Sequence, residues 1–318
     1  MKKYKTIYGT LNGVSEETYY KDGTIKECII EKYSLLKTKH GDLIPKSDFS
    51  DVRSKYRNSL SFYSSGKLKS VYLEKKSPIN SEIGTIHAEM VTFYENGNVH
   101  RVFPLYGQIS GYWTEEEELK SLEPLKMEIN NIPFHNKISC YCLYPSGRVK
   151  SLTLGPKEKI KIKTSMGEIE TRIGISFYES GKIESIEPDL QTPLKSPIGD
   201  IIAYDNNPIG IHGDNNSLKF TDKGVLLSVK TIQSGVEIVD NNNEKKEILP
   251  KRRRSFVDMD NYEMVPIEIV FRNEKIEIQD SDGWLFEYST EQYTINSINN
   301  ELFKAEAICT NCASCASC

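Results

Sequence analysis

The chain has 318 residues, of which 38% are hydrophobic and 27% are charged, and its net charge is -4. This composition is typical of a soluble globular protein, and the slightly acidic balance gives no general attraction to nucleic acid or anionic membranes. The opening, MKKYKTIYGTLNG, has no apolar stretch behind its basic start, and no window approaches the roughly 18 apolar residues of a membrane span. We therefore expect a cytoplasmic protein that binds neither membranes nor nucleic acid.

One short phrase recurs six times along the first 230 residues. Its copies are TYYKDGTIKEC (18–28), SFYSSGKLKSV (61–71), TFYENGNVHRV (92–102), CLYPSGRVKSL (142–152), SFYESGKIESI (176–186) and KFTDKGVLLSV (219–229). Each copy has an aromatic or apolar pair, two further residues, then Gly, then a polar residue, and then a β-branched residue or Leu. Because glycine accepts the positive φ that tight reversals need, the phrase predicts a β-hairpin.

A two-residue turn of type I′ would set the register of these hairpins. Tyr178 would then lie opposite Ile183, and Tyr63 opposite Leu68. Aromatic residues paired across strands with β-branched residues or Leu stabilise an antiparallel ladder by roughly 0.2 to 1 kcal/mol per pair. The other face of the sheet would carry Phe62, Phe93 and Phe177, with Leu60 and Val71 two steps further out. Isolated hairpins are marginal in water, so the copies must join into a continuous sheet.

A second, weaker phrase alternates with the first and places a glycine before each copy. These glycines are Gly9, Gly41, Gly84, Gly107, Gly167 and Gly199. The alternation predicts an array of six units over residues 1–235, with two glycine turns in each unit and insertions of uneven length between them.

Phrases such as FYESGKIESI and FYSSGKLKSV resemble the units of bacterial MORN-repeat-variant proteins, which read Tyr-x-x-Gly-x-Leu or Val. The resemblance covers residues 1 to about 235. It implies antiparallel hairpins laid side by side in an elongated sheet. It also implies a non-catalytic role, either in protein–protein scaffolding or, as in some members, as an antitoxin or immunity protein that neutralises a toxin.

The remaining segments predict a helix, a cap and a tail. WTEEEELKSLEPL (113–125) has Thr114 as a candidate N-cap, with acidic residues in its first turn, where the helix dipole favours them. Residues 236–305 form a β-rich cap, because repeat arrays need atypical ends. Within the cap, residues 265–289 alternate apolar and polar over two strands joined near Arg272, with a further turn at Asp282-Gly283. Residues 306–318 form a cysteine-rich tail. The expected fold is all-β: an elongated antiparallel sheet of repeated hairpins with a small C-terminal cap.

The tail repeats cysteine at steps of three residues. These cysteines are Cys309, Cys312, Cys315 and Cys318. A C-x2-C pair lets two thiolates reach one zinc ion or an iron–sulfur cluster, although four cysteines crowded this closely disfavour a single closed tetrahedral site. The tail also resembles the modified core segments of ribosomally made peptide precursors. Three alternatives stay open: metal binding, covalent modification, and a plain tail with free thiols.

No motif in the chain assembles a catalytic site. The five histidines lack metal-ligand spacing, and no Walker loop, GxGxxG or GxSxG is present. The run Lys251 to Arg254 is short and has no interleaved aromatic residues, which is typical of a solvated loop rather than a phosphate-binding patch.

The sequence therefore predicts a binding module and not an enzyme. Its partner would be a protein, held by rows of aromatic side chains on one face of the sheet, since aromatic residues are common interface anchors. The candidate contacts are Tyr63, Tyr94, Tyr144, Tyr178, Phe62, Phe93 and Phe177. The alternative is a protein whose repeats present the cysteine tail to zinc, to an iron–sulfur cluster or to a modifying enzyme.

Overall fold

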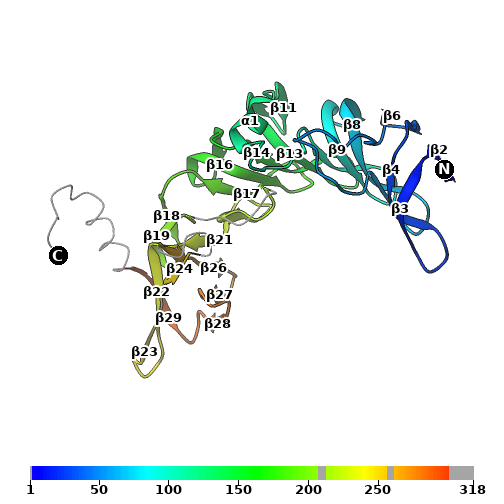
Figure 1. The fold of residues 1–318 in the computed structure, drawn as a ribbon. Coiled ribbons are helices and arrows are strands. Elements are labelled where there is room, and N and C mark those ends of the chain that lie inside the picture. Colours follow the sequence, from blue (N-terminus) through cyan, green and yellow to red (C-terminus); the bar gives the residue numbers. More distant parts are fainter. Residues whose placement is uncertain (1, 207–212, 256–260, 301–318) are drawn as a thin grey trace. The chain divides into compact units, whose positions relative to one another are not determined.

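A computed structural model describes residues 2–206, 213–255 and 261–300 (Figure 1). The chain folds into two compact units. The first unit is Met1–Glu158 with Phe177–Gly181, and the second unit is Lys159–Ser176 with Lys182–Cys318.

The first unit contains one short helix and 14 strands. They are β1 (Lys3–Thr6), β2 (Gly9–Asn12), β3 (Val14–Tyr19), β4 (Ile25–Ile30), β5 (Leu36–Thr38), β6 (Gly41–Leu43), β7 (Leu60–Phe62), β8 (Leu68–Ser81), β9 (Gly84–Phe93), β10 (Val99–Phe103), α1 (Glu115–Lys120), β11 (Met127–Ile129), β12 (Ile132–Phe134), β13 (Ile138–Leu143) and β14 (Val149–Leu154).

The described part of the second unit contains strands only. They are β15 (Lys159–Thr164), β16 (Gly167–Phe177), β17 (Ile183–Pro188), β18 (Thr192–Ser196), β19 (Gly199–Ala203), β20 (Leu218–Phe220), β21 (Leu226–Thr231), β22 (Ser234–Val239), β23 (Lys245–Ile248), β24 (Lys251–Arg254), β25 (Tyr262–Val265), β26 (Ile267–Phe271), β27 (Lys275–Gln279), β28 (Leu285–Ser289) and β29 (Thr294–Asn299).

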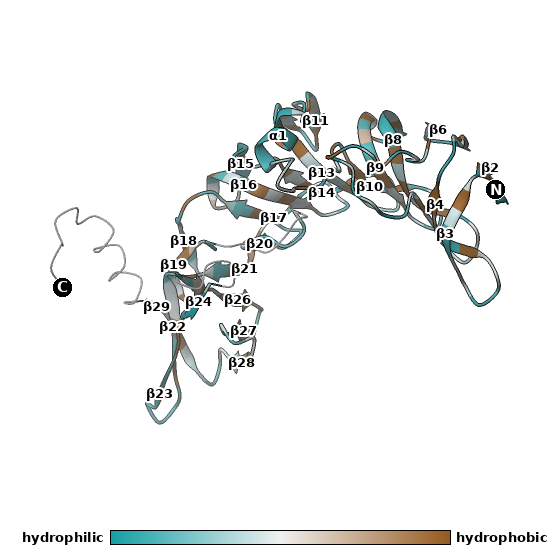
Figure 2. Cartoon of the chain, in the orientation of Figure 1, coloured by the Kyte–Doolittle hydropathy of each residue, from teal (hydrophilic) through white to brown (hydrophobic). Residues whose placement is uncertain are grey.

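The all-β prediction is confirmed: the described residues include an antiparallel sheet of 16 strands, and the repeated phrases form most of these strands. Within the first unit the strand order is β14-β13-β10-β9-β8-β7-β4-β3, so neighbours in sequence are mostly neighbours in the sheet. Within the second unit the order is β28-β27-β26-β21-β20-β17-β16, and β15 pairs with β16. Figure 2 shows hydrophobic and hydrophilic residues intermixed along the strands of each unit, as the alternation of side chains requires.

The turns of the sheet hairpins differ from the predicted type I′ geometry. In the second copy the Tyr63 amide donates to Lys67 O (2.8 Å) and the Gly66 amide donates to Tyr63 O (2.9 Å). The loop therefore has three residues and ends at a glycine with φ of +74°, which is the next commonest hairpin connection after the two-residue turns. The register prediction is wrong by one residue: Phe62, and not Tyr63, lies opposite Leu68.

The same loop closes the other copies of the phrase. The amides of Gly23, Gly97, Gly147, Gly181 and Gly224 each donate to the carbonyl of the residue three positions earlier. The strand that follows the loop then contains one extra residue, which forms a β-bulge. In the third copy this residue is His100, between Val99 and Arg101. A three-residue loop was not distinguishable by composition, because Ser-Gly and Asn-Gly serve in both turn types.

A row of apolar side chains crosses the sheet of the first unit and forms its core. Successive strand pairs are Cys28–Leu60, Leu60–Val71, Val71–Val91, Val91–Val102, Val102–Tyr141 and Tyr141–Leu152. All seven side chains are at most 4% exposed. The predicted pairing of Leu60 and Val71 on one face is thus confirmed.

The second phrase forms a different hairpin, closed by a two-residue loop. Five copies read Ser/Thr-x-x-Gly, and the hydroxyl of the first residue donates to the carbonyl of the glycine at 2.7 to 2.9 Å. Gly9, Gly41, Gly84, Gly167 and Gly199 all have positive φ and occupy this position, as predicted.

The fourth glycine of that series is an exception. Gly107 lies outside any strand, and the hairpin in its place is β11–β12, which reverses at Asn130 and Asn131 with φ of +52° and +63°. Asparagine tolerates the left-handed region because its side chain can hydrogen-bond locally. The two hairpin types therefore alternate along all six copies of the repeat, although the glycine prediction is wrong for Gly107.

The predicted helix is present but shorter, as α1. Thr114 is its N-cap, and a capping box joins the Thr114 hydroxyl to the Glu117 amide while the Glu117 carboxylate accepts from the Thr114 amide. Four glutamates occupy its first turn, where they complement the helix dipole.

The C-terminal segment continues the sheet. β26 pairs with β21 and is followed by β27 and β28, with reversals at the two predicted positions, after Phe271 and at Asp282-Gly283. β22, β23 and β29 form a separate three-stranded sheet. The boundary at residue 236 between array and cap stays a prediction. No helix in the part of the chain that the structure describes is long and apolar enough to cross a membrane.

Candidate binding surface

Three of the predicted contact tyrosines, Tyr63, Tyr94 and Tyr144, link their hairpin to the next one through their hydroxyl groups, and so does Tyr20. In each case the phenol donates to the backbone carbonyl of the residue that precedes the turn in the next hairpin. The bonds are Tyr20 to Phe62 (2.9 Å), Tyr63 to Phe93 (2.8 Å), Tyr94 to Leu143 (2.9 Å) and Tyr144 to Phe177 (2.9 Å). We call Tyr20, Tyr63, Tyr94 and Tyr144 the tyrosine row. Burial raises the pKa of the Tyr63 phenol, which keeps it in the donating form.

The rings of the tyrosine row are half-buried, and a lysine lies over two of them. Lys69 Nζ is 5.8 Å from the centroid of the Tyr63 ring, and Lys150 Nζ is 5.9 Å from that of Tyr144. The ring of His100 lies 4.4 Å from that of Tyr94. Each of these three partners is the bulged residue that follows the turn of its own hairpin. The three-residue loop therefore places an aromatic ring and a cationic or imidazole group together in three consecutive hairpins.

The predicted phenylalanines have a different position. Phe62, Phe93 and Phe177 are 1%, 2% and 0% exposed, and they belong to the core. Phe62 and Phe93 each lie two residues along the strand from a buried core residue, Leu60 or Val91, and therefore point to the same, covered face of the sheet. These three rings have no surface to offer to a partner.

Tyr178 begins the fifth turn and is half-buried, and its carbonyl accepts from the Gly181 amide at 2.8 Å. In its copy of the repeated phrase, Tyr178 has the same position as the members of the tyrosine row have in theirs. The next copy has Thr221 at that position, so Tyr178 is the last phenol in this series.

The four tail cysteines, Cys309, Cys312, Cys315 and Cys318, lie outside the described residues. Within 2–206, 213–255 and 261–300, no group of three or more His, Cys, Asp or Glu side chains could hold a metal ion. The remaining cysteines, Cys28, Cys140 and Cys142, are buried, and burial raises the pKa of the Cys28 thiol to about 12. Zinc, iron–sulfur or modification chemistry at the tail therefore stays a prediction.

The basic run is a strand and not the expected loop. Lys251 to Arg254 form β24, which pairs with β25, and their charges are engaged within the chain. Arg253 Nε lies 2.7 Å from a Glu263 oxygen, Lys251 pairs with Asp282, and the Arg252 guanidinium lies over the Tyr262 ring. Cations with internal partners are poorly available to phosphates.

One ion cluster in the first unit was not visible in the sequence. Arg53 donates to both oxygens of Glu118 (2.6 and 2.8 Å) and to Glu89 (2.6 Å), and Trp113 Nε1 donates to Glu118 (2.7 Å). Burial raises the pKa of Glu89 despite Arg53. Burial also opposes ionisation of Glu118, but its additional donors, which include the Gly107 amide, hold its pKa below the usual range. The cluster anchors α1 to a loop 65 residues away in sequence.

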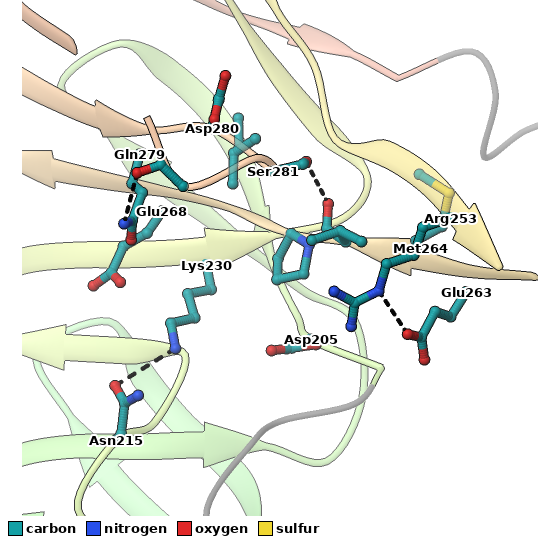
Figure 3. A pocket seen from close by; sticks show the side chains of 14 residues that line it. Asp205, Asn215, Lys230, Arg253, Glu263, Met264, Glu268, Gln279, Asp280 and Ser281 are labelled. Carbon is teal, nitrogen blue, oxygen red and sulfur yellow. Dashed lines mark hydrogen bonds and ion pairs between the residues drawn. The ribbon is translucent and has the colours of Figure 1, made fainter. Parts of the chain in front are cut away.

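A pocket of about 390 Å³ lies in the second unit (Figure 3). Its volume is in the range of small-molecule sites, about 300 to 1,000 Å³. Its charged side chains have partners within the protein: Arg253 pairs with Glu263, Glu268 pairs with Lys219 at 2.8 Å, and Lys230 reaches Asn215 at 3.5 Å. Such a pocket has few unsatisfied groups with which to select a ligand.

No protein-family model matches the chain, and comparison with curated proteins and with solved structures finds no significant match. The MORN-like resemblance therefore rests on the repeated phrase alone.

Proposed function

We propose that the chain is a non-catalytic β-repeat protein that binds a protein partner through the tyrosine row of its first unit. The observation that carries the proposal is the constant pairing of a half-exposed ring with a cationic or imidazole group in three consecutive hairpins. The phenol groups are committed to backbone carbonyls, so the rings are held before any partner arrives. A rigid aromatic contact loses little conformational entropy on binding.

The charges beside the row favour an acidic partner. Lys69 and Lys150 form no ion pair within the described residues. Successive strands are about 4.8 Å apart, so hairpins repeat the ring and its charge at intervals of about 10 Å. An extended acidic segment that runs across the strands would meet them in succession. The resemblance to MORN-repeat-variant proteins extends this proposal to a toxic protein as the partner, neutralised by an antitoxin-like chain.

The test is affinity capture from the native host with the full chain as bait. We expect one protein with an acidic segment to be retained, and to be lost when Lys69→Glu and Lys150→Glu are combined, because like charges then face each other. The matched control is Lys75→Glu with Lys126→Glu, which makes the same charge change at exposed positions of the same unit. Equal loss with the control pair, or undiminished capture by the first pair, would reject the tyrosine row as the binding surface.

A further inference from the structure

A second cleft lies in the first unit, where two hairpin types meet. It has a volume of about 340 Å³ and is bounded by the loops of the β1–β2 and β5–β6 hairpins and by the sheet turns that follow β7 and β9. Its lining includes three lysines, Lys37, Lys39 and Lys67, and no aspartate or glutamate. Apolar surface comes from Ile7, which is 76% exposed, and from buried Leu68.

The lysines of this cleft have no counterions. None of the three is in an ion pair within the described part of the chain, and the one side-chain bond among them joins Lys39 to the neutral amide of Asn98. Most other charges described above have a partner. Three lysines that line one hollow repel each other, and an anion in the hollow would relieve that repulsion.

His40 forms part of the wall of the same cleft. It is 6% exposed, with Nδ1 at 2.7 Å from Asn80 O and Nε2 at 2.9 Å from Gly97 O. These two backbone contacts hold the imidazole ring in place between the β5–β6 loop and the turn that follows β9.

The next repeat shows what closes such a hollow elsewhere. Lys39 is the first loop residue of Thr38-Lys39-His40-Gly41, and Glu82 has the same place in Ser81-Glu82-Ile83-Gly84. A Cβ added at Gly147 would lie 2.1 Å from Glu82 Cγ, because that side chain covers the turn, whereas one added at the equivalent Gly97 would meet nothing within 4 Å. The space beside Gly97 is open where its counterpart is filled by a carboxylate side chain.

We propose that this cleft binds a small organic anion, with a phosphate or carboxylate group at Lys37, Lys39 and Lys67 and an apolar body against Ile7 and Leu68. At the equivalent turn of the next repeat, the side chain of Glu82 fills this space, which indicates that a carboxylate group fits it. Neither Lys69 nor Lys150 lines the cleft, so this site is separate from the proposed partner surface.

The test is calorimetric titration of the full chain with phenyl phosphate, benzoate, inorganic phosphate and benzyl alcohol, together with amide chemical shifts. We expect saturable binding of phenyl phosphate or benzoate, weaker binding of inorganic phosphate, no binding of benzyl alcohol, and shifts concentrated at Gly97 and Leu68. Lys37→Met with Lys67→Met should lower the affinity about tenfold, because two of three charges are lost.

The matched control is Lys163→Met with Lys195→Met. These lysines precede the Ser or Thr of the β15–β16 and β18–β19 hairpins, as Lys37 precedes Thr38 in β5–β6. The proposal is overturned by the absence of saturable binding to either organic anion. It is also overturned by an equal loss of affinity in both double variants, which would indicate diffuse attraction to lysines. Either result would leave the partner-capture experiment unaffected.

Discussion

Glu187 is a fully buried carboxyl group with unusual electrostatics. Its oxygens accept from the Ser217 amide (2.8 Å) and from the Ser217 hydroxyl (3.0 Å). Burial, with a smaller contribution from the charge of Asp205, raises its pKa from 4.5 to about 7 despite those bonds and the Arg172 charge. Because the folded pKa is the higher one, the folded chain keeps this proton in a range where the unfolded chain has lost it.

The stability of the second unit should therefore fall as the pH rises from about 4.5 to about 7 and level off above that. The expected loss is on the order of 3 kcal/mol. The Glu187→Gln variant should remove most of this slope. The measurement is urea unfolding at pH 5, 6 and 7, with the exposed Glu116→Gln as control. A Glu187→Gln variant that keeps the wild-type slope would contradict this assignment.

The Tyr and Phe rows could be predicted from the sequence, but which of the two rows is buried could not. Tyr and Phe adjacent in sequence must point to opposite faces of a strand, so the sequence predicted two rows correctly. Which row is buried depends on what covers each face. In the first unit, Phe62 and Phe93 are buried, while Tyr63 and Tyr94 stay half-exposed at the turns.

At the scale of elements, the glycines that close the sheet hairpins differ in what surrounds them. Gly66 (φ +74°) has no atom within 4 Å of an added Cβ, so Gly66→Ala should cost only the strain of the left-handed conformation, about 1 kcal/mol. Gly147 (φ +89°) has Glu82 against it, with Cβ at 2.7 Å, so Gly147→Ala should cost more. Thermal or urea unfolding of both variants measures the difference.

The Gly147→Ala/Glu82→Ala double variant is the control for this comparison. Removing the Glu82 side chain beyond its Cβ should bring the cost of Gly147→Ala closer to that of Gly66→Ala. If the two glycine variants are equally stable, or if the double variant gains nothing, Glu82 does not cover the turn in solution.

For the whole molecule, a sheet built from nearest-neighbour hairpins should be least protected where it ends. Among the described residues, β3 pairs in the sheet only with β4, and its register shifts between Ser15 and Thr18, whereas β9 pairs with both β8 and β10. We expect amides of β3 to exchange with deuterium at least about tenfold faster than those in the Val91 region of β9. Mass spectrometry after proteolysis measures this, and equal protection would indicate that an additional contact covers β3.

Local chemistry accounts for most of what was predictable. Glycine at the turns, alternation along the strands, and Thr114 before four glutamates all act within a few residues, so the all-β class, the hairpins at the repeated phrases and α1 followed from the sequence. The exact register did not, because a loop of two residues and a loop of three use the same amino acids.

The repeated hairpins follow from the amino-acid sequence, because hydrogen bonding and backbone conformation at each glycine turn depend on residues close in the chain. Three features became visible in the folded chain: which face is the core, which carboxylates Arg53 joins, and a hollow lined by Lys37, Lys39 and Lys67 with no counterion among the described residues. Those features depend on side chains brought together from different hairpins. The distances between these side chains are set by the way neighbouring hairpins pack within one sheet.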